Sequence, residues 1–374
     1  MSTGLGAISK AGFKKDTEES AYPKTDWGDS DLGSGDQVPF LSEGVAGDNK
    51  LEADQTIEGK AGLRASDLVA RDIAGPITLQ GRYNNIGRLL CMAMGWENPN
   101  VAGATYHGSP ETVSAKYKHV FELDDVLHRQ TWTLDGDRLP SGGGGGTWDS
   151  NDQKVRSGCL IIAKQVTDWR FFSVMVNKMT IKAEPKGTSF VFDLIGYNYS
   201  RGSYNSANFT LATNQGNILF ADYVFSINGT EYGVSNFEVT LDNKLAAERD
   251  TATGLYIKEP VRDEMREVTF GFDFLRHESD SLFDNYDAGT ERYCSMKATS
   301  GAYNFGIYFS AFKFEKVDAN VAGAGILRPK HNCRAYIPAS DQFASEWSNI
   351  QLKKNKEMVI MLTNDHSTNY LTEN

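Results

Sequence analysis

The chain has 374 residues, which is enough to bury a sizeable core and allows two or three domains. Its 20 Phe and 16 Tyr, with 36 Gly for turns, favour β structure over a helical bundle. A formal charge of −11 excludes a protein that grips the nucleic-acid backbone, because such binding needs a basic surface; the chain could still surround or guide nucleic acid.

Residues 1–55 are polar and irregular, so we expect an extended N-terminal arm with little core of its own. The start of the arm, "MSTGLGAISKAGF", lacks the apolar stretch of a secretory signal. The longest apolar runs of the chain have the length of a strand, so no membrane insertion is expected.

The first strong strand pattern is "GPITLQG" at 75–81, and a helix follows within 84–95. Ile86, Leu89, Leu90 and Ala93 have helical spacing there, and Gly95 is a natural end. Further strands are predicted in "KYKHVFEL", "RQTWTLDG", "GCLIIAKQV", "FFSVMVNKMTIKAE" and "TSFVFDLIGYNY", and a glycine-rich loop at 141–152 interrupts them. Asn228-Gly229 lies between two strand patterns and predicts a two-residue hairpin turn with positive φ.

The strongest alternation of the chain lies in residues 234–275, at both ends of a long charged connection. Apolar residues at every second position predict one buried face, formed by Phe237, Val239, Leu241, Phe270, Phe272 and Phe274. The opposite parity carries Glu238, Thr240, Asp242 and Asp273, so two half-buried strands present a polar face to water.

An earlier pair of strands, in "MTIKAEPKGTSFVFDLIG", resembles this later pair. Each has a strand, a connection and a returning strand with an aromatic-Asp-apolar triplet, which puts Lys178, Lys182 and Asp193 on the corresponding polar face. Internal duplication and chance similarity of alternating strands both remain open.

The tail, 341–374, predicts a short helix around "FASEWSNIQ" and a strand, "EMVIML". We therefore expect an arm at 1–55, a β domain at 56–340 and a C-terminal extension at 341–374.

No pattern of catalytic or metal-binding residues is found. The four cysteines contain no CxxC pair, and His119 and His128 lie too far apart for the usual zinc spacings. The loop from Asp29 lacks the ligand positions of an EF-hand. Asp124 and Asp125 are adjacent and would point to opposite faces of a strand, and no GxSxG motif occurs. The sequence therefore predicts no enzyme and no cofactor.

Several segments, in their order along the chain, resemble a tail tube protein of a tailed bacteriophage, most like the siphophage type. They are "PFLSEGV", "LEADQTIEGKAG", "PITLQGRYNNIGRLLCMAMG", "YKHVFEL", "SGCLI", "VNKMTIKAEPKGTSFVFDLIG", "FEVTLDNKL" and "REVTFGFDFL". Together they cover roughly residues 38–340. The five-glycine loop and the tail after Ala339 depart from this pattern.

The resemblance implies a mainly β tail-tube fold: a β-sandwich or split barrel with one flanking α-helix and long hairpins that join a ring-wide β-barrel. It implies rings of six subunits that stack into a tube, with the tape measure, tail terminator and distal tail proteins as partners. DNA would pass without specific binding, in a virion tail assembled in the host cytoplasm.

The resemblance also implies roles for individual residues. The channel lining would comprise Lys178, Lys182, Asp193, Glu238, Thr240, Asp242 and Asp273. The long connection at 243–267 would bridge stacked rings through Lys244, Glu248, Arg249, Asp250, Lys258, Glu259 and Arg262.

Two other functions are open on the residues alone. A β-sandwich adhesin or decoration protein that binds carbohydrate would expose aromatic residues on a loop, for which Trp132 and Trp148 are the only indication. A glycoside hydrolase would need two converging carboxylates, and none is identified.

Overall fold

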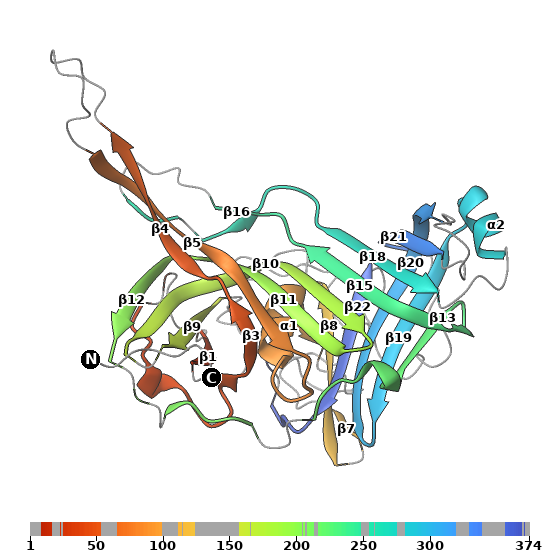
Figure 1. The fold of residues 1–374 in the computed structure, drawn as a ribbon, viewed down its shortest axis with the longest axis horizontal. Coiled ribbons are helices and arrows are strands. Elements are labelled where there is room, and N and C mark those ends of the chain that lie inside the picture. The colour runs from red at the N-terminus through yellow and green to blue at the C-terminus, as the bar shows by residue number, and fades with distance from the viewer. Residues whose placement is uncertain are drawn as a thin grey trace, which may run out of the picture.

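The computed structural model describes residues 9–16, 23, 25–53, 66–98, 111–113, 115–123, 157–164, 166–203, 205, 208–212, 216–247, 254–257, 259–274, 281–318, 329–338, 356–368 and 370. Their strands close into one barrel, which is flattened into two antiparallel layers (Figure 1). The predicted mainly β fold is therefore confirmed.

The first layer is a six-stranded antiparallel sheet. In spatial order its strands are β5 (Ser66–Gln80), β11 (Gly187–Gly196), β10 (Asp168–Glu184), β15 (Val234–Asp242), β18 (Glu267–Phe274) and β21 (Lys330–Ala335). β3 (Phe40–Glu43) and β4 (Ala46–Ala53) pair with β5 at the outer edge of this layer. The two hairpins whose sequences resemble each other thus lie side by side, as β11–β10 and β15–β18.

The second layer packs against the first. Its strands are β13 (Tyr223–Ile227), β19 (Arg292–Ser300), β20 (Tyr303–Asp318), β22 (Met358–Asn364) and β8 (Lys116–Leu123). The margins carry β14 (Thr230–Tyr232), β6 (Gly95–Asn98) and β7 (Glu111–Val113). β20 joins the layers, because residues 304–309 pair with β22 whereas residues 312–318 pair with β21.

A smaller sheet lies beside the layers, next to the N-terminus in Figure 1. It contains β2 (Gln37–Val38), β1 (Lys10–Lys15), β9 (Gly158–Ala163), the first part of β10 and β12 (Asn198–Gly202). β10 passes from this sheet into the first layer at Ser173, where φ is +48° and the pairing register shifts. The Ser173 hydroxyl donates to the buried Asp16 carboxylate at 3.2 Å, which holds the bend in place.

The core between the layers is aromatic. The rings of Phe270 and Phe309 stack with centroids 4.1 Å apart, and those of Phe225 and Phe272 lie 4.7 Å apart. Each fully buried Phe contributes about 1.5–3 kcal/mol of apolar burial, so these contacts dominate the packing of the two layers.

Two α-helices are short. α1 (Gly87–Met94) packs against β10 and β8 and ends at Gly95 with φ of +89°, as its apolar spacing predicts. α2 (Ser281–Asp287) was not predicted, since its seven residues are too few to show a helical period. Two 3₁₀ turns, η2 (Asp29–Asp31) and η5 (Phe220–Asp222), lie in the loops. The turn between β13 and β14 has the predicted positive φ at Asn228 (+50°) and Gly229 (+77°).

Both ends of the chain contribute to the same core as its middle. Phe13 of β1, Phe272 of β18 and Ile360 of β22 belong to one continuous apolar cluster. β22, the predicted strand "EMVIML", lies between β20 and β8. The arm and the C-terminal extension expected from the sequence thus supply strands to the body of the molecule.

Candidate functional site

Four adjacent strands present one continuous polar surface, which we call the polar face. It is formed by the outward residues of β11, β10, β15 and β18: Ser189, Val191, Asp193, Lys178, Thr180, Lys182, Asn236, Glu238, Thr240, Asp242, Glu267, Thr269, Gly271 and Asp273. The strand registers arrange them in rows across the sheet. Asp193, Lys178, Asp242 and Glu267 form one row, and Lys182, Glu238 and Gly271 form another.

The reverse side of the same strands faces the core. Phe237, Val239, Leu241, Phe270, Phe272 and Phe274 are all buried, as the alternation requires. On the outer, polar side, the Thr180 and Thr240 hydroxyls lie 3.4 Å apart, between the two rows of charged residues. The sheet therefore separates a wet surface from a largely apolar interior, in which the buried Thr188 hydroxyl donates to the Tyr223 hydroxyl at 3.1 Å.

Several charges on the polar face have partners. Lys182 Nζ lies 3.3 Å from Glu238 Oε1, and Asn236 Nδ2 donates to Asp273 Oδ2 at 2.6 Å. At the end of β15, Lys244 Nζ lies 3.0 Å from Asp242 and 4.0 Å from Glu267, so it bridges two strands. The hydrogen bond from Lys244 to Asp242 raises the pKa of the ammonium group above its ordinary value.

β21 extends the polar face with residues that the sequence did not indicate. Arg334 lies 2.8 Å from Glu267 and also pairs with Glu315 of β20, which raises the pKa of the guanidinium. Lys330 lies opposite Asp273 in register. The inward residues of β21 include His331 and Cys333, which do not give the apolar alternation that would have assigned Lys330 and Arg334 to the polar face.

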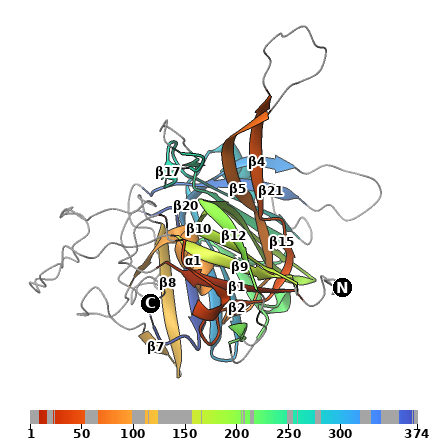
Figure 2. The ribbon, with the colours of Figure 1, turned by 90° about the vertical axis from the view of Figure 1, so that its left-hand side faces the viewer.

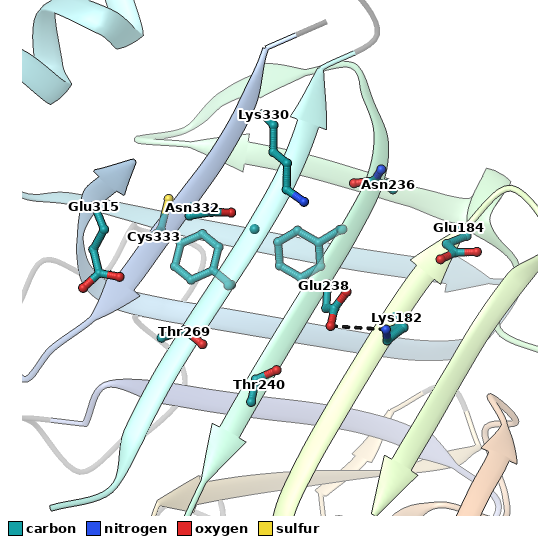
Figure 3. A pocket seen from close by; sticks show the side chains of 13 residues that line it. Lys182, Glu184, Asn236, Glu238, Thr240, Thr269, Glu315, Lys330, Asn332 and Cys333 are labelled. Carbon is teal, nitrogen blue, oxygen red and sulfur yellow. Dashed lines mark ion pairs between the residues drawn. The ribbon is translucent and has the colours of Figure 1, made fainter. Parts of the chain in front are cut away.

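A depression of about 450 Å³ opens in the polar face above Gly271 (Figure 3). Gly271 stands in register between Glu238 and Asn332, so its missing side chain leaves the floor of the depression empty. Side chains of both charge signs surround it, namely Lys182, Glu184, Glu238, Glu315 and Lys330. The depression is open to solvent, and Phe237, Phe270 and Cys333 contribute to its lining beside the charged residues.

The connection at 243–267 folds back on the subunit where it is described. β16 (Leu245–Ala246) pairs with β17 (Val261–Arg262), and Ile257 is buried. Arg71 of β5 donates its backbone N–H to Leu255 O at 2.7 Å, and the Arg71 side chain donates to the Tyr256 hydroxyl at 3.3 Å. The connection thus runs beside β5.

The residues predicted to bridge rings fall in different places. Lys244 belongs to the end of the polar face, and Arg262 Nε donates to Asn243 O within the subunit at 3.1 Å. Glu259 lies in the described part of the connection. Glu248, Arg249, Asp250 and Lys258 lie outside the described residues.

The hairpin of β4 and β5 projects from the body of the molecule, as Figures 1 and 2 show. Leu51 is 61% exposed and Val69 is 46% exposed, and both lie on the projecting part. The hairpin was not predicted from the sequence, because residues up to 55 were expected to form an irregular arm.

The other candidate groups that the structure describes, His119 and the cysteines, are buried. His119 is buried with Nδ1 2.6 Å from Glu97 Oε1, and its Nε2 lies 3.0 Å from His366 O. Among the described residues no group of three or more His, Cys, Asp or Glu could hold a metal ion. The four cysteines are buried, and burial raises the pKa of the Cys159, Cys294 and Cys333 thiols. His128, Asp124, Asp125, Trp132 and Trp148 lie outside the described residues.

Comparison with known proteins gives one family. A family model described as "Phage tail tube protein" matches residues 8–332, which is most of the chain. A search of curated proteins finds no match. In the described part of the chain, no helix has the length and apolar character needed to span a membrane.

Proposed function

Because this chain belongs to the phage tail tube protein family, we propose that its polar face lines the channel of a tube built from stacked rings. The chain is a structural component of the virion tail, and its family implies self-assembly into a tube. The resemblance in sequence suggests six subunits per ring. In this arrangement DNA leaves the capsid along the polar face.

The observation that carries the proposal is the continuity of the polar face. Four antiparallel strands carry mostly polar side chains outward, with register shifts only near Asn177 and Ser235, and the phenylalanines lie on the opposite side of the sheet. Joining such sheets between subunits gives a closed barrel that leaves no exposed strand edges along the channel. The face holds five acidic residues, Asp193, Glu238, Asp242, Glu267 and Asp273, against two lysines on the same strands, Lys178 and Lys182, so it does not attract phosphates strongly.

Contacts between stacked rings are proposed for the projecting β4–β5 hairpin together with the connection at 243–267. The connection is anchored to β5 through Arg71 and Tyr256, so both elements lie on the same side of the subunit (Figure 1). Head-to-tail contacts of this kind are heterologous and can propagate without closing. The tape measure, tail terminator and distal tail proteins remain the proposed partners at and within the tube.

Electron microscopy of the purified protein tests the proposal. Negatively stained samples should show rings and filaments with an axial hole, and class averages of end views should show six repeats. Protein that stays monomeric by light scattering at high concentration, also with the other tail proteins present, would contradict it.

A further inference from the structure

The lysines of the polar face lie between carboxylates. Lys182 contacts Glu238 on the next strand at 3.3 Å, and Lys178 stands in register between Asp193 and Asp242. The Lys182 and Glu238 side chains are 40% and 53% exposed, so both can be reached by a large solute. Figure 3 shows the pair at the rim of the depression above Gly271.

The same arrangement recurs where the face ends. Lys244 lies between Asp242 and Glu267, and Arg334 lies between Glu267 and Glu315. The carboxylate partners raise the pKa of both basic groups above their ordinary values. Basic groups of this surface are therefore repeatedly placed against acidic partners.

We propose that Glu238 masks Lys182 from DNA phosphates. The channel wall then resists adhesion of DNA because individual charges are paired, and not because the polar face as a whole has a negative field. The inference rests on the proposed function, because it concerns DNA that moves past this face. Lys182 is the residue whose adhesion is suppressed, and Glu238 is the residue that positions its ammonium group.

The physical reason is competition for one cation. A phosphate that binds Lys182 must first displace the Glu238 carboxylate, whereas a lysine without a partner binds phosphate by releasing only counterions. An exposed ion pair contributes up to about 1 kcal/mol, which corresponds to about fivefold in affinity for each lysine. The effect multiplies when a DNA molecule contacts several subunits.

Glu184, which lies on the same strand as Lys182, provides a matched control. It is exposed and lines the same depression as Glu238, but it makes no ion pair with any residue that the structure describes. Glu184→Gln and Glu238→Gln remove the same charge from nearly the same place. A general field predicts equal effects for the two changes, whereas masking predicts an effect for Glu238→Gln alone.

The test measures binding of a short fluorescent DNA duplex to free subunits and to assembled tubes, between about 50 and 200 mM salt. For Glu238→Gln we expect binding up to about fivefold tighter for each contacting subunit, with a salt slope steeper by about 0.9 for each lysine released. Glu184→Gln should bind like the unaltered protein. The double variant Lys182→Met/Glu238→Gln should lose the tighter DNA binding expected for Glu238→Gln.

Equal tightening by both single variants would overturn masking in favour of a general field. Unchanged binding by Glu238→Gln, in variants with unaltered circular dichroism, would overturn it as well. The assay on free subunits does not depend on where the face lies in the tube. A failure of the channel assignment is thus distinguished from a failure of the masking inference.

Discussion

Tyr83 places a hydroxyl group in the core, where no hydrogen-bond partner is found for it among the residues that the structure describes. Its ring stacks on Tyr303 with centroids 5.4 Å apart, so the aromatic part is well packed. Burial, with a smaller contribution from Asp222, raises the pKa of Tyr83 to about 12. The hydroxyl therefore costs stability without forming a bond.

Tyr83→Phe should stabilise the subunit by about 1 kcal/mol in urea unfolding at pH 7, because it removes a buried polar group that lacks a partner. The substitution should also make the stability of the subunit less sensitive to alkaline pH. The folded state keeps the Tyr83 proton above pH 10, where an unfolded tyrosine loses it, so this residue makes stability fall as the pH rises from 10 to about 12.

Tyr303→Phe is the matched control for this change. The Tyr303 hydroxyl donates to Asp365 Oδ2 at 2.8 Å, so its removal should destabilise the subunit by about 1 kcal/mol. Equal effects of the two substitutions would contradict the distinction between a bonded and an unbonded hydroxyl.

Among the elements, the β4–β5 hairpin has a part that projects from the body of the molecule (Figures 1 and 2). A two-stranded hairpin alone is marginally stable in water, yet this one carries exposed Leu51 and Val69 on its projecting part. Apolar residues on a ribbon that leaves the body are consistent with a contact made by a neighbouring copy in the stacked rings.

Leu51→Ser/Val69→Ser should change the free energy of unfolding of the subunit by less than about 0.5 kcal/mol for each site, since both side chains are exposed. Tubes should nevertheless be shorter, because the ring-to-ring contact loses its apolar part. Tube length in negatively stained samples is the measurement. Val224→Ser on β13, 48% exposed, is the control that should keep normal lengths. Normal lengths for the double variant would assign stacking to other elements.

Elements with local signals could be predicted from the sequence. Period-two alternation predicted β15 and β18, because each strand has one buried and one wet face. Helical spacing before Gly95 predicted α1 in the same way. The contribution of both chain ends to the shared core could not be predicted, because pairing between distant segments leaves no local pattern. β22 joins β20 and β8 from the end of the chain, and no residue within it indicates that place.

For the candidate site, the sequence predicted only on which side of its strand each residue lies. Alternation put Glu238, Asp242 and Asp273 on one side, but it could not give the registers that place Lys182 beside Glu238. Arg334 was missed because the inward residues of β21 are His331 and Cys333. The depression above Gly271 is lined by residues of five strands, β10, β15, β18, β20 and β21, and has no signature in any one of them.

At the scale of the whole molecule, the proposed tube requires each subunit to turn its polar face inward. One continuous core cluster contains residues of β1, of both layers and of β22. The polar face is therefore one surface of a single packed subunit. All four native cysteines are buried, and introduced cysteines on the surface can therefore be labelled against a low background.

Assembled tubes of Glu238→Cys, Asp242→Cys or Asp273→Cys should resist a maleimide attached to a polymer too wide for the channel, because these positions face the bore. Free subunits of the same variants should label readily, since the native side chains are at least partly exposed. A small maleimide should reach the sites in both forms and so shows that the thiols are intact. Val224→Cys, in the second layer, should label in tubes with either reagent. Ready labelling of the three polar-face variants in intact tubes by the wide reagent would put this face on the outside, because no bulky solute could reach a channel wall through the packed barrel.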